Sequence, residues 1–206
     1  NSSFNRYFGS YDFHNLYKEL LNFCTVDLSA FYFDIRKDTL YCDPLSSQKR
    51  KSTLLVLNII LQCLLRWFAP ILSFTTEEIY QLVSKKKNSI HLENFLNVPK
   101  KFENLELNEK WSQLLKIRDV CNLSIEEKRA SKEIGSSLEA AITIKINKQK
   151  LKILEGIDFA ELCITSSAEI KFHDTDEIDV QTNKAQGNKC PVCWKISEEP
   201  CQRHGH

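Results

Sequence analysis

The chain has 206 residues, of which 42% are hydrophobic and 27% are charged. These proportions are typical of a soluble globular protein with enough apolar residues for one large or two small domains. The formal net charge of +1 excludes a protein that attracts nucleic acid through an overall basic field, so any RNA contact has to come from local clusters of Lys and Arg.

Two helices are predicted near the start of the chain. Asp12 precedes apolar residues at helical spacing, which indicates a helix with Asp12 as its N-cap. We expect a break near Thr25, a second helix that begins at Asp27, and a turn from Lys37 to Pro44.

The strongest helical pattern covers residues 47–68. Asn58, Gln62 and Arg66 recur every four residues and form one polar seam on an otherwise apolar cylinder, which is typical of a helix at the centre of a bundle. The apolar run from residue 54 to 69 would rise about 24 Å, short of the roughly 30 Å hydrocarbon core of a bilayer. We therefore expect no membrane partner, and we expect Arg66 to pair with an acidic neighbour rather than with RNA.

The remaining elements are shorter. Thr75 and Glu78 fit a capping box for a helix that runs to about Val83, with Phe74 and Ile79 at the staple positions. Residues 88–107 look irregular, and residues 111–130 return to helical spacing. Alternation over residues 141–147 predicts a half-buried strand, followed by a short helix near 148–155. Further strands are expected near 161–165, 169–172 and 178–181, and residues 181–189 are expected to form a linker.

These elements predict a mainly α fold in three parts. Residues 1–92 form a helical bundle, residues 93–185 form a connecting helix and a small α+β domain, and residues 186–206 form a zinc-binding knuckle.

The last part carries metal-ligand spacing. Cys190 and Cys193 are separated by two residues, as are Cys201 and His204, and tetrahedral zinc takes such pairs of thiolate and imidazole donors. A redox dithiol is the alternative for the first pair alone. His206 competes with His204 for the fourth place. Four ligands would close the site, so the zinc would be structural and would supply folding energy to the tail.

Four other cysteines stand alone within apolar patterns: Cys24, Cys63, Cys121 and Cys163. Buried free thiols have this pattern, whereas a secreted disulfide framework staples a much shorter chain. We therefore expect a reducing compartment, the cytoplasm.

Four stretches in order resemble the C-terminal half of the isoleucyl-tRNA synthetases of bacterial type. They are residues 11–17 (YDFHNLY) leading into 22–41 (NFCTVDLSAFYFDIRKDTLY), residues 69–80 (APILSFTTEEIY), residues 118–120 (RDV) with 127–140 (EKRASKEIGSSLEA), and the terminal zinc knuckle with Trp194 after its second cysteine. The first two are similar to the anticodon-binding helical bundle of class I synthetases. The valyl relatives share the bundle but are expected to lack the zinc tail, which favours the isoleucyl family.

The resemblance implies a cytoplasmic, monomeric enzyme that attaches isoleucine to tRNA(Ile) with ATP and Mg²⁺, of which this chain is a non-catalytic, tRNA-binding part. The nucleotide signatures His-x-Gly-His and Lys-Met-Ser-Lys-Ser are absent from the sequence, so ATP and Mg²⁺ would bind in a catalytic domain outside it. The family usually fills the zinc site with four cysteines and a longer loop, whereas here His204 stands in the fourth place.

Candidate RNA contacts are cations in clusters and exposed planar groups, since unpaired bases stack on aromatic or guanidinium planes. They are Lys49, Arg50, Lys51, Arg118, Arg129, Lys132, Trp194 and Arg203. Each cluster is alternatively a solvated face, and Trp194 alternatively packs on the knuckle. No catalytic role is assigned to Ser136, Ser137 or Glu139, because no histidine lies near them in the sequence.

Two other functions remain open on these residues. The first is a stand-alone zinc-dependent nucleic-acid-binding module, such as the zinc finger that ends some DNA-repair glycosylases. Those enzymes carry a catalytic N-terminal proline, and no proline precedes Pro44 in this sequence. The second is a structural protein–protein module whose basic clusters only keep it soluble.

Overall fold

The computed structural model describes residues 2–84, 88–96, 98–201 and 203. The chain divides into two compact units, residues 1–103 and residues 104–206. Each unit has its own elements and core, and each is described by itself below. The three-part division into 1–92, 93–185 and 186–206 remains a prediction.

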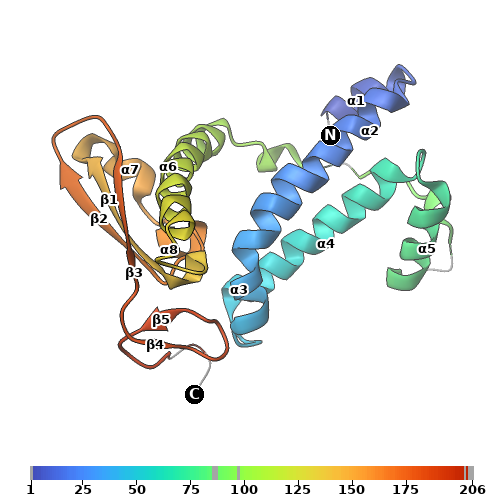
Figure 1. The fold of residues 1–206 in the computed structure, drawn as a ribbon. Helices are drawn as coiled ribbons and strands as arrows, with labels where there is room; N and C mark the ends of the chain where they lie inside the picture. Colours follow the sequence, from blue (N-terminus) through green and yellow to red (C-terminus); the bar gives the residue numbers. More distant parts are fainter. Residues whose placement is uncertain (1, 85–87, 97, 202, 204–206) are drawn as a thin grey trace. The chain divides into compact units, whose positions relative to one another are not determined.

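The first unit is helical (Figure 1). Asp12 caps α2 by accepting a hydrogen bond from the Asn15 amide at 3.2 Å, as predicted, and Ser47 caps α4 through the Arg50 amide at 3.3 Å. The elements are α1 (Ser2–Gly9), α2 (Phe13–Asn22), η1 (Phe23–Phe33), α3 (Asp34–Cys42), α4 (Gln48–Phe68), α5 (Ser73–Val83), η2 (Ile90–Leu92) and η3 (Lys100–Phe102).

One long helical rod replaces the two helices expected at the start of the chain (Figure 1). The expected break near Thr25 is wrong, because η1 continues the helix as an 11-residue π-helix into α3. The Thr25 hydroxyl donates to the Leu21 carbonyl at 2.9 Å within this rod. The wider π-helical turn shifts the phase of the apolar positions, which imitates a break in a 3.6-residue pattern. The turn therefore starts after Cys42 and not at Lys37.

The predicted bounds of helix α4 are confirmed, but the helix is not buried along its whole length as expected. Its first half leaves Leu54 and Leu55 exposed by 50% and 62%, so it is not buried on all sides by the described residues. It is also long and apolar enough to cross a membrane by length and composition alone. Its C-terminal half is packed: Leu65, Ala69, Tyr80 and Ile90 form one buried cluster with α5 and η2.

The polar seam of α4 ends in a buried ion pair, as expected for Arg66. Arg66 is 8% exposed, and its guanidinium lies 3.2 Å from the Glu93 carboxylate. It also donates to the Asn94 carbonyl at 3.0 Å and to Gln62 Oε1 at 2.8 Å. The Tyr80 hydroxyl donates to the other Glu93 oxygen at 2.9 Å. This network fastens the segment after η2 onto α4 and α5.

The start of α5 differs from the expected capping box. The helix begins at Ser73, and its N-cap position, Leu72, provides no side-chain hydrogen bond. Phe74 is 93% exposed and therefore cannot form the predicted staple. The Thr76 hydroxyl instead donates back to the Leu72 carbonyl at 3.0 Å.

The second unit packs one long helix on a small mixed sheet (Figure 1). Strand β1 lies in the centre, parallel to β2 and antiparallel to β3. Alternate residues of β1 are buried, as predicted, and the Ser124 hydroxyl of α6 contacts the Thr182 hydroxyl of β3 at 2.8 Å. The elements are α6 (Leu105–Ala130), η4 (Ser137–Glu139), β1 (Ala140–Asn147), η5 (Lys148–Lys150), α7 (Leu151–Leu154), α8 (Phe159–Leu162), β2 (Ser167–His173), β3 (Asp179–Lys184), β4 (Asn188–Lys189) and β5 (Ile196–Ser197).

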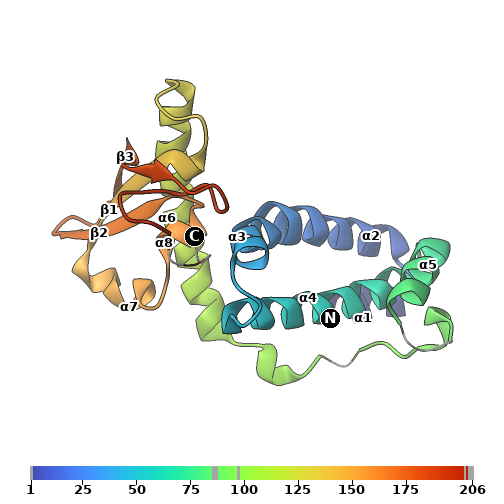
Figure 2. The same cartoon turned by 90° about the horizontal axis from the view of Figure 1, so that it is seen from below.

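Two expectations for this unit are wrong. Residues 161–165 are not a strand: α8 ends at Leu162, and Ile164 turns the chain with a φ of 56°. Residues 181–189 are not simply a linker, because β3, labelled in Figure 2, continues to Lys184, and β4 pairs with β5 (Figure 1). A four-residue apolar helix turn and a short strand have the same composition, so periodicity over so few residues does not separate them.

Three of the four lone cysteines are buried, as expected. Cys63 lies in the first unit, and Cys121 and Cys163 lie in the second, where their thiols are hydrogen-bonded to each other. Cys24 is only partly buried.

Candidate metal centre and nucleic-acid interface

A short hairpin presents the predicted metal ligands. Strands β4 and β5 pair through Asn188 with Ser197 and Lys189 with Ile196. Gly187 precedes them with a φ of 113°, and a Cβ there would lie 2.2 Å from the Ser197 backbone, so only glycine fits. Between the strands, the Cys190 amide donates to the Lys195 carbonyl at 2.8 Å, which closes the turn.

Three of the predicted ligands lie together. The sulfur atoms of Cys190, Cys193 and Cys201 are all within 4.8 Å of one another. Tetrahedral zinc with Zn–S bonds of about 2.3 Å requires sulfur atoms about 3.8 Å apart, so this cluster fits the ion after a small contraction. His204, like its competitor His206, lies outside the described residues.

The hairpin backbone also favours the thiolate form of Cys190, which is the form that binds a metal. Hydrogen bonds from the backbone N–H groups of Cys193 and Val192 lower the pKa of Cys190, because they favour its thiolate. Burial raises the pKa of Cys193 to about 11. The third thiol, Cys201, distinguishes this cluster from a simple dithiol pair, and a bound cation would stabilise all three as thiolates.

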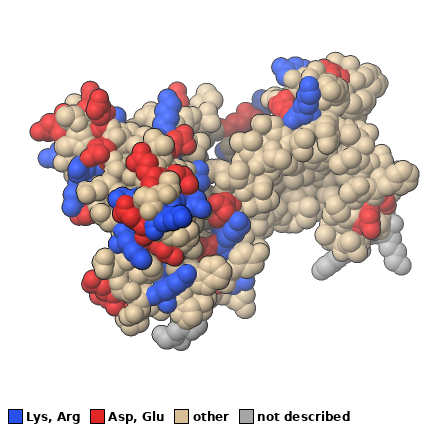
Figure 3. Space-filling model, viewed as in Figure 1, with Lys and Arg blue, Asp and Glu red and all other residues tan. Residues whose placement is uncertain are grey.

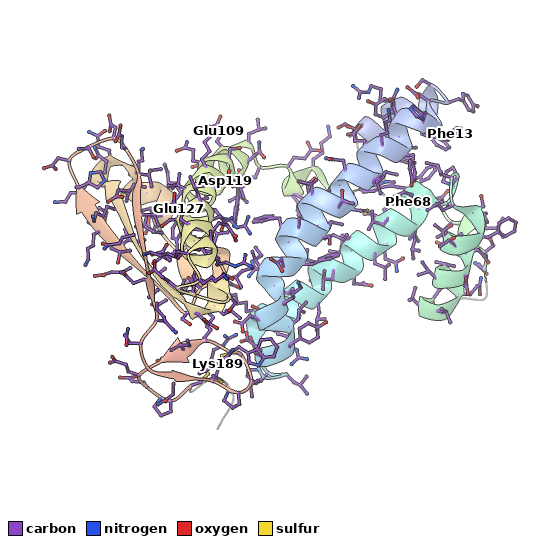
Figure 4. All side chains as sticks on the ribbon, in the orientation of Figure 1. Phe13, Phe68, Glu109, Asp119, Glu127 and Lys189 are labelled. Carbon is purple, nitrogen blue, oxygen red and sulfur yellow. The ribbon has the colours of Figure 1, made fainter. Side chains whose placement is uncertain are left out.

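Trp194 lies in the turn segment between β4 and β5 and is exposed. Its φ of 64° is rare for a residue with a large side chain, and the ring is 59% exposed. The ammonium of Lys189, the residue labelled on the hairpin in Figure 4, lies 5.6 Å from the centre of this ring. Arg203 is exposed as well. The arrangement offers an aromatic face with one neighbouring cation, Lys189, to a partner. Lys189 was missed in the sequence because a single Lys beside a cysteine carries no distinctive signal.

The end of α6 and the turn after it form a second basic surface. A pocket of about 460 Å³ is lined by Glu126, Arg129, Ala130, Lys132, Ile134 and Gly135. Arg129 is exposed and lies 2.6 Å from Glu126, and Lys132 adopts a φ of 60° at the turn. Arg118 lies elsewhere on the helix, where its Nε donates to the Leu162 carbonyl at 2.9 Å. Arg118 thus holds α8 against α6.

The third candidate cluster lies at the start of α4. Lys49 and Lys51 are exposed. Arg50 is half-buried, and its Nη1 donates to the Asp43 carbonyl at 2.7 Å, which braces the turn before the helix. On the face shown in Figure 3, Lys and Arg gather mainly over the second unit, interspersed with Asp and Glu, while the helical unit presents mostly uncharged surface.

Comparison with known proteins gives a consistent result. Residues 1–145 match the family described as the anticodon-binding domain of tRNA ligase. An isoleucine–tRNA ligase of Pelagibacter ubique is 64% identical over 204 residues, which are 99% of this chain and 22% of that protein. The isoleucine–tRNA ligases of Bartonella quintana and Agrobacterium fabrum are 42% and 39% identical, over 95% and 93% of this chain and 21% of each relative.

The chain thus spans about a fifth of the length of these relatives. The family match covers well over half of the chain and includes the whole helical unit described above. The chain therefore belongs to the family of anticodon-binding domains of tRNA ligases.

Proposed function

We propose that this chain is the tRNA-recognition portion of an isoleucine–tRNA ligase, a cytoplasmic, monomeric enzyme that attaches isoleucine to tRNA(Ile) with ATP and Mg²⁺. The observation that carries the proposal is the 64% identity to one such ligase over nearly the whole chain. In this proposal α4 is a bundle helix and not a membrane span, and the buried Arg66–Glu93 pair at its end supports that role. The chain itself binds RNA and carries out no chemistry.

The zinc knuckle has a structural role in this proposal. Cys190, Cys193, Cys201 and His204 would hold one Zn²⁺, with His206 as the alternative fourth donor. A bound zinc ion would supply folding energy to a tail too short to bury a core of its own. The thiolates of Cys190 and Cys193 lie on one turn, so metal binding would fix the backbone that presents Trp194.

RNA would be bound by two kinds of contact. Trp194 and Arg203 provide planar groups on which unpaired bases stack, and Lys189 adds a positive charge beside the tryptophan. Arg129 and Lys132 at the pocket on α6, and Lys49 with Lys51 on α4, would attract phosphates. Arg50 and Arg118 each hold a backbone carbonyl, so in the proposal they contribute charge while they stay in place.

A titration with isoleucine tRNA at several salt concentrations tests the binding role. Affinity should fall steeply as salt rises, because each phosphate contact releases counterions, and a tRNA for another amino acid should bind more weakly. Equal, salt-independent affinity for both tRNAs would refute the proposal. ATP–pyrophosphate exchange should be undetectable for this chain alone, and measurable exchange would show that it carries catalysis.

Metal analysis tests the zinc site. The purified chain should contain about one equivalent of zinc, and Cys201→Ala should lose it. Cys24→Ala is the matched control, because Cys24 is a partly exposed thiol in the helical unit, and its zinc content should stay unchanged. Zinc retained in Cys201→Ala would refute the ligand set.

A further inference from the structure

Ser166 connects the zinc hairpin to the rest of the second unit. Its hydroxyl oxygen accepts a hydrogen bond from the Ile196 amide of β5 at 2.7 Å, and the same hydroxyl donates to the Leu138 carbonyl of η4 at 2.5 Å. Its backbone amide donates to the Ala140 carbonyl at 2.9 Å. One small side chain therefore joins the two-stranded hairpin to the segment that leads into β1.

The chain is turned sharply to bring Ser166 to this place. Helix α8 ends at Leu162, and Ile164 takes a φ of 56°, which a β-branched residue rarely adopts. The Thr165 amide donates back to the Ala160 carbonyl at 2.9 Å, and Thr165 is fully buried. An unfavourable conformation that is held by these contacts usually marks a position the fold depends on.

Both ends of this link lead to the surfaces proposed to bind RNA. Leu138 lies three residues after Gly135, which lines the pocket with Arg129 and Lys132. Ile196 lies two residues after Trp194, which is exposed. A serine hydroxyl can donate and accept at the same time, so Ser166 adds a second link between η4 and the hairpin, beside the Ala185 amide, which donates to the Glu139 carbonyl at 2.8 Å.

We propose that Ser166 is a positioning residue for tRNA recognition: it holds the zinc hairpin and the basic pocket in one register, so that both engage the same RNA. The inference rests on the proposed tRNA-binding function. Ser166 touches no RNA itself. Its removal leaves every cation, Trp194 and the zinc ligands in the chain and changes only how the two surfaces are held.

The test compares variants of the full, zinc-loaded chain in titrations with isoleucine tRNA over a range of salt. Ser166→Ala should bind roughly three- to tenfold more weakly, in line with the loss of one or two hydrogen bonds. Its affinity should also depend less steeply on salt, because one surface no longer reaches its phosphates. A smaller folded fraction would lower the affinity equally at all salt concentrations and would leave this dependence unchanged.

Two further variants complete the design. Ser166→Thr keeps the hydroxyl and should restore both the affinity and its salt dependence. Ser167→Ala is the matched control, because this neighbour is exposed on the edge of β2, and it should behave as the wild type. In Ser166→Ala the Ile196 amide should exchange its hydrogen faster, while the zinc content stays at one equivalent.

Each outcome decides the proposal. Wild-type affinity in Ser166→Ala, beside weakened binding in Cys201→Ala, overturns the positioning role alone. Loss of zinc in Ser166→Ala overturns it too, since the serine would then serve the metal site. If the wild-type chain binds no tRNA, the proposed function fails and this inference fails with it.

Discussion

The buried Arg66–Glu93 pair offers a quantitative test of how the helical unit is held together. Arg66→Met keeps most of the side-chain volume and removes the charge. The Glu93 carboxylate is 14% exposed in the native structure, and in the variant it keeps the Tyr80 hydroxyl, which donates to it at 2.9 Å. Removing one partner of a buried pair costs about 3–5 kcal/mol, and we expect the lower end, about 3 kcal/mol, because Tyr80 still serves the carboxylate.

The matched control is the exposed pair of Arg129 and Glu126. Its side chains are 45% and 61% exposed, although its 2.6 Å distance is shorter than that of the buried pair. Exposed pairs contribute roughly 0–1 kcal/mol, so Arg129→Met should change stability by less than about 0.5 kcal/mol. The comparison separates burial from distance as the source of the effect.

Urea denaturation followed by the fluorescence of Trp67 measures Arg66→Met, and denaturation followed by the fluorescence of Trp111 measures Arg129→Met, because the two pairs lie in different units. Trp194→Phe is introduced in both variants, with Trp111→Phe added to the first and Trp67→Phe to the second, so that each signal comes from the unit that carries the substitution. A cycle with Glu93→Gln should give a coupling energy of roughly 1–3 kcal/mol between Arg66 and Glu93. An Arg66→Met effect no larger than that of Arg129→Met would refute the reasoning.

Three further predictions follow from single residues. Trp194→Ala should weaken tRNA binding by about 1–3 kcal/mol with little loss of stability, since Trp194 is 59% exposed. Trp194→Phe should retain part of the binding. An unchanged affinity in Trp194→Ala would exclude base stacking. Gly187→Ala should distort the hairpin and lower the zinc affinity, because the added Cβ would lie 2.2 Å from the Ser197 backbone. Gly9→Ala, which has open space around it, should leave the zinc affinity unchanged. Hydrogen bonds, first of all from the Ile90 amide, hold the pKa of Glu77 below its ordinary value of 4.5. The stability due to Glu77 should thus be complete above about pH 4.5 and be lost as the pH falls through its lowered pKa, and Glu77→Gln should remove that part of the pH dependence.

Much of the fold was predictable where one physical signal dominated. The N-cap at Asp12 and the alternation of buried and exposed residues along β1 depend on local sequence, and the structure contains both. The closeness of Cys190 to Cys193 was predictable because two-residue spacing puts paired side chains on one turn. Arg66 was predictable because a charge on an apolar helix has to find a partner.

Other features depend on contacts that no local pattern contains. The π-helical turn of η1 changes the period itself, so a search for 3.6-residue spacing reports a break at Thr25. The capping box at Thr75 failed because α5 starts earlier, against the turn at Leu72. Ser166 had no signal at all, since its two partners lie 28 and 30 residues away in the sequence.

Each unit contains buried thiols whose alkylation can report when that unit opens. Cys63 is 5% exposed in the first unit, and Cys121 and Cys163 are 0% and 3% exposed in the second. Burial raises the pKa of Cys63, and the hydrogen bond with Cys163, together with burial, raises that of Cys121. Alkylating reagents therefore reach these sulfur atoms only when the surrounding structure opens. After a short labelling pulse, the mass shift of each cysteine-containing peptide would identify which unit had opened. The labelled fraction of that peptide would measure how often it opened.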